Sequence, residues 1–206
     1  MLPREGEGWL SEETADDPVR LMKRRVWIVD PIDGTKEFVR GRPEWCVSVG
    51  LVEDGRAVAG GILNPETDEL VLGSLETGVT LNGEPVHMRE CTELEGAVVL
   101  ASRTEVRRGE WEDYEGTGLV IESLGSVAWK MARVAAGKAD ASWTLRPKNE
   151  WDVAAGAALI AAAGGVCFLP DGSEMTFNRP DPLLRGLAGT AAGLVGPVTE
   201  LLRERF

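Results

Sequence analysis

The chain of 206 residues has one histidine, one tyrosine and three cysteines, and these shortages exclude several kinds of site. A metal site built on two histidines cannot form within one chain, and a Ser-His-Asp triad would depend on His87 alone. The cysteines Cys46, Cys91 and Cys167 are far apart and lack a paired spacing, so we expect free thiols in a reducing compartment. Chemistry based on carboxylates and metal ions remains.

Long apolar runs are also missing. No stretch approaches the roughly 18–20 apolar residues of a membrane-spanning helix, and residues 1–7 have no apolar core of the kind found in secretory signals. We therefore expect a cytoplasmic protein without a membrane segment. The net charge of −12 argues against a surface for nucleic-acid polymers or anionic membranes. An anionic substrate would need a local positive centre, and a bound metal ion would supply one.

The composition is typical of a globular protein, with 43% hydrophobic and 27% charged residues, and the chain is long enough to bury a substantial core. The 25 glycines and 11 prolines indicate many tight loops between short elements. Alternating apolar residues predict an antiparallel meander over 46–81.

The most informative stretch is VWIVDPIDGTKEF at residues 26–38. Residues 26–29 predict a buried strand, and we expect Pro31 to end it because proline removes a backbone donor and fixes φ. Asp30 and Asp33 would then lie on one tight loop with a carbonyl between them. Mg²⁺ prefers oxygen ligands of this kind and often shares them with a substrate phosphate.

The residues that follow the second aspartate suit an anion. Gly34 permits close approach of the backbone, and Thr35 is placed to cap the next segment and to offer its hydroxyl and nearby N–H groups to a phosphate. Taken alone, Asp-Pro-x-Asp-Gly is more typical of an ordinary turn. The short motif therefore leaves both alternatives open, and the longer string has to decide between them.

A second motif, EWDVAAG at residues 150–156, opens an apolar helix that is predicted to end at Gly164 and Gly165. By itself, Asp152 at this helix start is typical of a cap, or of a side chain that interacts favourably with the helix dipole.

Together the two motifs resemble the signatures of the inositol-monophosphatase-like superfamily, whose members are Mg²⁺-dependent, lithium-sensitive phosphatases. DPIDGT follows an apolar strand, and WDVAAG precedes a Gly-Gly stop, in the order that the superfamily shows. Within the superfamily, residues 36–38, Lys-Glu-Phe, resemble the 3′(2′),5′-bisphosphate nucleotidases more than the inositol monophosphatases, which usually carry Asn-Phe there.

The resemblance implies an α+β fold, a layered αβαβα sandwich with the metals between an antiparallel and a mixed sheet. It implies two or three Mg²⁺ ions held by Glu12 of a Ser-Glu-Glu motif, Asp30, the Ile32 carbonyl, Asp33 and Asp152. The catalytic residues it implies are Glu12, Asp33 and Thr35, whose hydroxyl would orient the attacking water. The substrate-binding residues it implies are Asp33, Gly34, Thr35, Arg103, Ser126, Lys130 and Asp152.

Some of these assignments have alternatives. Arg103 follows a predicted strand as in the nucleotidases, yet it could equally be a surface arginine. Ser126 and Lys130 lie on a helix predicted over 125–137, whose spacing departs by one residue from the nucleotidase pattern and resembles the inositol branch. The expected partner is a small phosphorylated metabolite. The resemblance of residues 36–38 to the nucleotidases favours 3′-phosphoadenosine 5′-phosphate over inositol, histidinol or sugar phosphates.

We expect two halves in one compact catalytic unit, an antiparallel-sheet half with the metal loop over 1–93 and an α/β half over 94–206. Members of the superfamily begin with two further helices and an Asp-bearing loop that partners the threonine, and this sequence shows no counterpart. Their absence would expose an apolar sheet face and invite a homodimer or another partner chain. A catalytically silent subunit that binds metal or nucleotide is the alternative from a different functional class.

Overall fold

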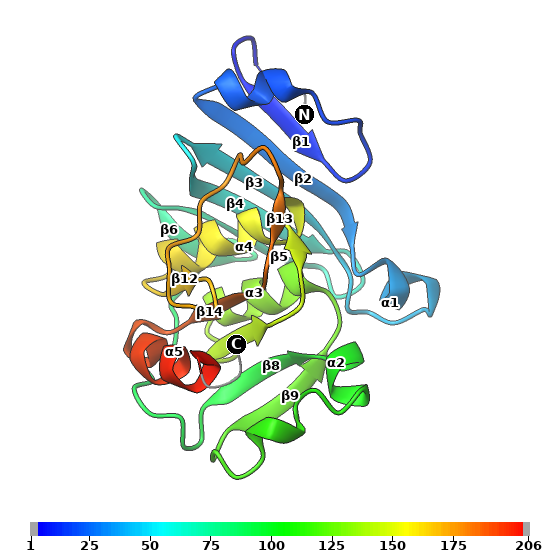
Figure 1. Cartoon of the computed structure of the whole chain (residues 1–206). Coiled ribbons are helices and arrows are strands. Elements are labelled where there is room, and N and C mark those ends of the chain that lie inside the picture. The colour runs from blue at the N-terminus through cyan, green and yellow to red at the C-terminus, as the bar shows by residue number, and fades with distance from the viewer. Residues whose placement is uncertain (1–3, 204–206) are drawn as a thin grey trace.

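The computed structural model describes residues 4–203, which form two main β-sheets with two helices between them (Figure 1). The first sheet has the strand order β1-β2-β3-β4-β5-β6-β7, and only its β1–β2 pair is parallel. Its strands are β1 (Gly8–Ser11), β2 (Arg25–Asp33), β3 (Cys46–Glu53), β4 (Arg56–Asn64), β5 (Glu69–Ser74), β6 (Gly78–Leu81) and β7 (Glu84–Val86). The predicted meander is present as β3 to β6.

The second sheet has the order β12-β14-β10-β8-β9 and is mixed, because β8 runs parallel to β9 and β10 while β14 is antiparallel to β10 and β12. Its strands are β8 (Val98–Ser102), β9 (Val120–Leu124), β10 (Ala141–Thr144), β12 (Val166–Phe168) and β14 (Leu187–Thr190). A short ribbon pairs β11 (Lys148–Asn149) with β13 (Leu183–Leu184).

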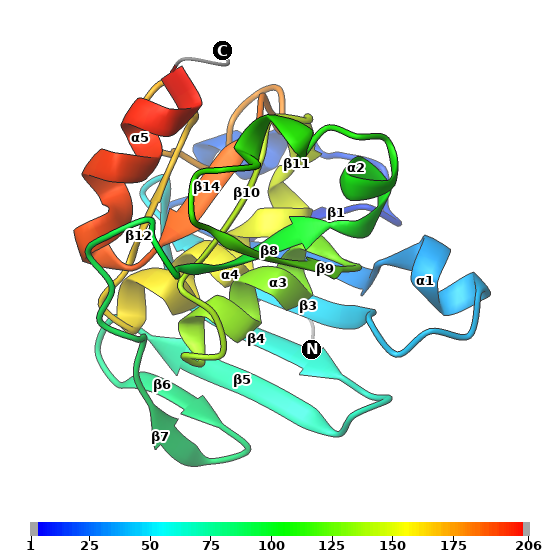
Figure 2. The ribbon, with the colours of Figure 1, turned by 90° about the horizontal axis from the view of Figure 1, so that it is seen from below.

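Helices α3 (Val127–Ala135) and α4 (Glu150–Ala162) lie between the two sheets, and α5 (Val195–Arg203) packs on the far face of the second sheet (Figure 2). The remaining helices are α1 (Thr35–Val39), α2 (Arg103–Arg107) and the 3₁₀ turns η1 (Pro18–Met22), η2 (Glu112–Tyr114) and η3 (Ala192–Leu194). This layered α+β architecture confirms the predicted fold class. None of the helices within residues 4–203 is long and apolar enough to cross a membrane.

Helix α4 approaches the first sheet closely because glycines face it. A Cβ built on Gly60 would lie 2.4 Å from the Ala155 carbonyl oxygen, and one on Gly50 would lie 2.8 Å from the Ala155 nitrogen. On its other side, a Cβ on Gly156 would lie 2.5 Å from the Met131 Cβ of α3. Glycine in a strand often marks such an approach of another backbone. The small residues of the WDVAAG motif therefore let α4 fit between a sheet and a helix.

Strand β2 does not end at Pro31 as predicted. It continues to Asp33, but its register against β3 shifts between Asp30 and Asp33. A bulge of this kind accommodates the backbone donor that proline lacks. The Ile32 N–H that leaves the ladder donates to Asp30 Oδ1 at 2.9 Å. The strand therefore bends without stopping.

No helix of residues 4–203 covers the outer face of the first sheet (Figure 2). A shallow cavity of about 430 Å³ lies on this face. It is lined by Trp27, Val47, Val49, Ala59, Gly60, Gly61, Leu63, Leu70, Leu72 and Gly73. The expected apolar face is thus present, and the homodimer expected to cover it stays a prediction.

We predict that Gly60→Ala lowers the free energy of unfolding by ~2 kcal/mol, since overpacking of a tight contact costs ~1–3 kcal/mol. Gly61→Ala is the matched control, because a Cβ there meets only the Leu72 Cδ1 atom, at 3.2 Å, on the uncovered face. We expect that change to stay within ~0.5 kcal/mol. Urea unfolding of the two variants measures the difference, and equal losses would contradict the close approach of α4.

Candidate metal and phosphate site

Three aspartates from two elements meet at one end of the space between the sheets. Asp30 and Asp33 come from the end of β2, and Asp152 comes from the first turn of α4. One carboxylate oxygen of each lies within 4.8 Å of the other two. Among residues 4–203, none of the three forms an ion pair with lysine or arginine. Asp30 and Asp33 are buried and Asp152 is half-buried, and a donor set of such unpaired carboxylates fits a hard divalent cation such as Mg²⁺.

Asp152 both caps helix α4 and belongs to the carboxylate cluster. Its Oδ2 accepts a hydrogen bond from the Asn149 backbone N–H at 2.9 Å, which stabilises the start of α4. The sequence left a cap and a metal ligand as alternatives for this residue. Because a carboxylate has two oxygens, the cap leaves the other oxygen for the cluster.

The DPIDGT loop folds back on itself after the cluster. Thr35 Oγ1 donates to the Ile32 carbonyl at 3.1 Å. Gly34 occupies the N-cap position of α1 with a φ of 93°, and a Cβ there would lie 2.9 Å from the Glu44 carbonyl oxygen. The prediction that Thr35 caps the following helix is therefore wrong, because a positive φ and a close backbone require glycine at that position.

Glu12 lies at the edge of the cluster. It follows β1 directly, and its N–H donates to the Val29 carbonyl at 3.4 Å. Its side chain is exposed and lies outside the group of three close carboxylates. Its negative charge nevertheless contributes to raising the pKa values of Asp30 and Asp152, so the structure brings it near them.

Two of the three carboxyl groups in the cluster, those of Asp30 and Asp152, have raised pKa values. Burial, followed by the charge of Asp33, raises the pKa of Asp30 to about 8 and that of Asp152 to about 7. Crowded carboxylates oppose ionisation in this way when no cation balances them. A divalent ion would favour the ionised forms.

The start of α3 fixes Asp33. Ser126 Oγ and the Ala128 N–H both donate to Asp33 Oδ2, at 2.5 and 2.6 Å. The same hydroxyl accepts from the Trp129 N–H at 2.9 Å and so caps α3. Ser126 has a φ of 56°, which is costly for a residue other than glycine and is held here by these bonds. Its hydroxyl is therefore committed to positioning Asp33.

Lys130 places a cation behind this carboxylate. The residue is only 3% exposed, and its Nζ donates to the Ser126 carbonyl at 2.9 Å. Burial lowers its pKa to about 8, although the Asp33 charge partly opposes this decrease.

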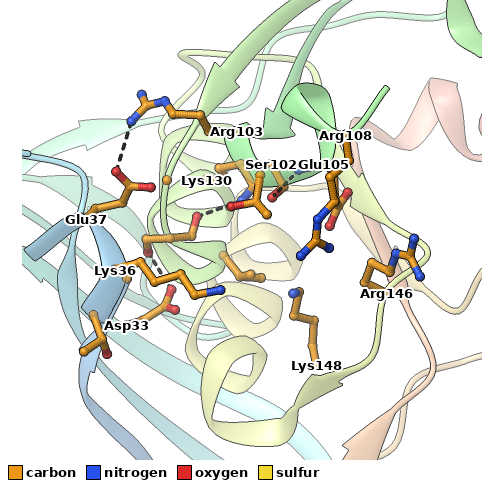
Figure 3. Close-up of a pocket in the computed structure, with 16 residues that line it drawn as sticks. Asp33, Lys36, Glu37, Ser102, Arg103, Glu105, Arg108, Lys130, Arg146 and Lys148 are labelled. Atoms are coloured by element: carbon orange, nitrogen blue, oxygen red, sulfur yellow. Dashed lines mark hydrogen bonds and ion pairs between the residues drawn. The ribbon is translucent and has the colours of Figure 1, made fainter. Parts of the chain in front are cut away.

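A cavity of about 380 Å³ opens beside Asp33 (Figure 3). It is lined by Asp33, Gly34, Thr35, Lys36, Glu37, Ser102, Arg103, Thr104, Glu105, Arg108, Gly125, Ser126, Val127, Lys130, Arg146 and Lys148. The expected loop and helix residues thus share one cavity.

Arg103 reaches this cavity but is already paired. It donates twice to the Glu44 carboxylate, at 2.9 and 2.6 Å, and once to Glu37 at 3.2 Å. Arg42 donates to the same Glu37. Arg103 is therefore neither an unpaired cation that is free to bind an anion nor a simple surface arginine. Arg103 ties the segment around α1 to α2.

Sequence reasoning missed several cations of the cavity wall. They are Lys36, Arg108, Arg146 and Lys148. The position of Lys148, four residues before Asp152, was the one signal available. The two arginines lie in polar stretches that resemble ordinary solvated surface.

We predict that the metal-free protein loses stability as the pH rises from about 5 to about 7.5. In this window the folded state binds more protons than the unfolded chain at Asp30 and Asp152, because their folded pKa values lie above the unfolded ones, so the free energy of unfolding falls. Mg²⁺ needs ionised ligands, and it should therefore raise the Tm more at the higher pH.

Thermal unfolding in a chelator and in Mg²⁺, at both pH values, measures this effect. Asp30→Asn should flatten the pH dependence and remove most of the Mg²⁺-induced rise in Tm. A Mg²⁺-induced rise in Tm that is no larger at the higher pH would contradict the proton competition.

Comparison with known proteins agrees with this geometry. The model of the inositol monophosphatase family matches residues 4–201. Inositol monophosphatase 3 of Solanum lycopersicum is 36% identical over 95% of this chain and 75% of its own length. The 3′-phosphoadenosine 5′-phosphate phosphatase of Mycobacterium leprae is 32% identical over 98% of this chain and 75% of its own length.

A solved structure shows the same fold. The inositol monophosphatase of Thermotoga maritima superposes with a TM-score of 0.82 at 30% identity, over 96% of this chain and 74% of that one. Members of the family are Mg²⁺-dependent phosphoric monoester hydrolases. With nearly its whole length matched by the family model, the chain belongs to the inositol monophosphatase family.

Proposed function

We propose that this chain hydrolyses 3′-phosphoadenosine 5′-phosphate to AMP and phosphate in the presence of Mg²⁺, by attack of water on phosphorus. The observation that carries the proposal is the cluster of Asp30, Asp33 and Asp152 at the edge of a cavity with a cationic wall. Carboxylates suit the metal, and the cations suit a small, multiply charged phosphate ester.

The residues that would hold two or three Mg²⁺ ions are Glu12, Asp30, the Ile32 carbonyl, Asp33 and Asp152. When bound, the ions supply a lowered pKa for a water molecule and stabilise the leaving oxygen. Asp33 comes from the first half of the chain and Asp152 from the second. We therefore propose that residues 1–93 and 94–206 work as one catalytic unit.

The loop after Asp33 would position the reacting groups. The Thr35 hydroxyl donates a hydrogen bond to the Ile32 carbonyl, so its lone pairs remain free to accept a hydrogen bond from the attacking water. The N–H groups of Gly34 and Thr35 would hold the phosphate oxygens. These assignments make Thr35 an orienting residue for the water and not a nucleophile.

The remaining residues expected to bind substrate divide into two groups. Lys130 lines the cavity and would place its charge near the phosphate. Ser126 would act through Asp33, because its hydroxyl donates to that carboxylate. Arg103 would act through Glu37 and Glu44, because both of its terminal nitrogens donate to them. We therefore propose them as positioning residues.

The comparisons favour a second candidate substrate as well. Relatives named inositol monophosphatase reach 36% identity, against 32% for the relative named 3′-phosphoadenosine 5′-phosphate phosphatase. Inositol 1-phosphate is therefore the alternative. A silent subunit would bind Mg²⁺ or nucleotide and release no phosphate from either compound.

We predict Mg²⁺-dependent, lithium-inhibited phosphate release with a higher kcat/KM for 3′-phosphoadenosine 5′-phosphate than for inositol 1-phosphate. A discontinuous assay of released phosphate with both compounds measures the preference. A reversed preference would assign the chain to the inositol branch. Release from neither, with Mg²⁺ binding retained in calorimetry, would favour the silent subunit.

We predict that Asp33→Asn lowers kcat/KM roughly 100-fold or more. Changing groups that only orient metal ligands already costs ~10–100-fold, and this substitution removes a charge from the cluster itself. Asp68→Asn, an exposed aspartate in the turn between β4 and β5, is the matched control and should keep parental rates. Parental rates in Asp33→Asn at limiting Mg²⁺ would overturn the assigned site.

A further inference from the structure

A buried arginine connects the N-terminal segment to the loop that precedes β13. Arg20, in η1, is only 2% exposed. Its Nε and Nη2 donate to the two carboxylate oxygens of Asp16, at 2.6 and 2.9 Å. Its Nη1 donates to Asn178 Oδ1 at 2.8 Å, and its Nη2 also donates to the Arg179 carbonyl at 3.0 Å. The rigid fork of donors on one guanidinium group therefore bonds two segments that are far apart in the sequence.

The same loop is bound to the start of α4. Glu150, the first residue of this helix, is fully buried, and its carboxylate accepts hydrogen bonds from the Asn178 and Arg179 N–H groups at 2.7 and 3.0 Å. Its own N–H donates to the Pro182 carbonyl at 2.9 Å. The loop, drawn in orange in Figure 1, then pairs through β13 with β11, directly before α4. Residues 178 and 179 thus lie between a buried cation and a buried anion.

This network lies between two elements that carry proposed metal ligands. Arg20 packs against β1, because a Cβ built on Gly8 would lie 3.1 Å from the Arg20 Cβ. Strand β1 leads directly to Glu12, and Glu150 precedes Asp152 by two residues in the first turn of α4. Hydrogen bonds therefore connect the segment that carries one ligand to the helix that carries the other.

Strand β1 has few other constraints. It is four residues long, and within residues 4–203 it lies at the edge of its sheet and pairs with β2 alone. Glu12 lies beyond the last paired residue, and its N–H reaches the Val29 carbonyl at the long distance of 3.4 Å. The ends of short edge elements open easily. Contacts on the other side of the segment therefore matter for where the Glu12 carboxylate lies.

We propose that Arg20 and Glu150 are positioning residues of the metal site. Through residues 178 and 179 they hold Glu12 at a fixed place relative to the start of α4. A buried polar network whose members are all hydrogen-bonded is rigid, and removal of one member leaves the others unsatisfied. The inference rests on the proposed function, because it takes Glu12 as a metal ligand. It adds two residues that touch neither metal nor substrate.

A double-mutant cycle with Mg²⁺ alone as the probe tests this role. Titration calorimetry of the parent protein and of Glu12→Gln should show a rise of about tenfold in the apparent Kd, within the ~10–100-fold typical of groups that orient metal ligands. Arg20→Met should cause a similar rise, and so should Glu150→Gln, which turns one of two acceptors into a donor. In either background, Glu12→Gln should add less than about twofold, because residues that act through one another are not additive.

A milder variant keeps the test independent of any loss of folding. Asn178 has a φ of 58°, a conformation that glycine adopts without strain. Asn178→Gly removes the two side-chain hydrogen bonds with Arg20 and keeps the N–H that Glu150 accepts. It should raise the apparent Kd for Mg²⁺ about threefold, as expected for the loss of hydrogen bonds that are replaced by water. The effect of Glu12→Gln should shrink by about the same factor.

The matched control is Arg24→Met. This arginine follows η1 closely, but its side chain is exposed and pairs with carboxylates at the surface. The control should keep the parental Kd, and Glu12→Gln should retain its full tenfold effect in that background. Additive effects of Arg20→Met and Glu12→Gln would overturn the positioning role. A lower Tm in chelator with an unchanged Kd for Mg²⁺, in both Arg20→Met and Asn178→Gly, would do the same.

Phosphate release separates this inference from the proposed function. If the parent binds Mg²⁺ but releases no phosphate from any substrate, the proposed function fails, and the calorimetric cycle still judges the positioning role. If Arg20→Met and Asn178→Gly release phosphate with the parental dependence on Mg²⁺ concentration, the positioning role fails and the proposed function stands. A parent protein that binds no Mg²⁺ would overturn both.

Discussion

The close approach of α4 to the seven-stranded sheet sets the position of the other parts of the molecule. Gly50 and Gly60 leave room for the helix backbone, because a Cβ at either position would collide with Ala155. Asp152 lies in the first turn of the same helix, so this packing also determines how near its carboxylate comes to Asp30 and Asp33. The geometry of the cluster is thus a result of helix-on-sheet packing and does not depend on the acidic loop alone.

Charges of both signs line the site. Carboxylates gather where the sheet, α3 and α4 meet, and the raised pKa values of Asp30 and Asp152 show the cost of bringing them together. Cations line other parts of the cavity, on α1, α2 and β11. Lys130 is buried at the cavity wall, and its positive charge interacts with that of Asp33.

Sequence reasoning succeeded where the signal is local. The strand before Asp30 and the helix after Asn149 were both predictable, because apolar runs and turn residues mark them within a few positions. The prediction that Thr35 caps the next helix also used a local signal, but it is wrong. A threonine at the start of a helix resembles a cap unless the positive φ of Gly34 is known. Pro31 was expected to end the strand, yet a bulge absorbs its missing donor.

Partners that are distant in sequence were not predictable in the same way. Arg103 pairs with Glu44, 59 positions away, and Ser126 bonds to Asp33, 93 positions away. Only the folded chain shows that these donors are occupied. The cations of the cavity wall were not predictable for the same reason. Arg108 and Lys148 lie on separate elements, and each residue alone resembles solvated surface.

The seven-stranded sheet also separates two kinds of surface. Its inner face carries α4 and leads to the acidic cluster, while its outer face presents Leu63, Leu70 and Leu72 to the surroundings. Because successive side chains of a strand point to opposite faces, a substitution at one of these leucines can change the outer surface and leave the contact between the sheet and α4 intact.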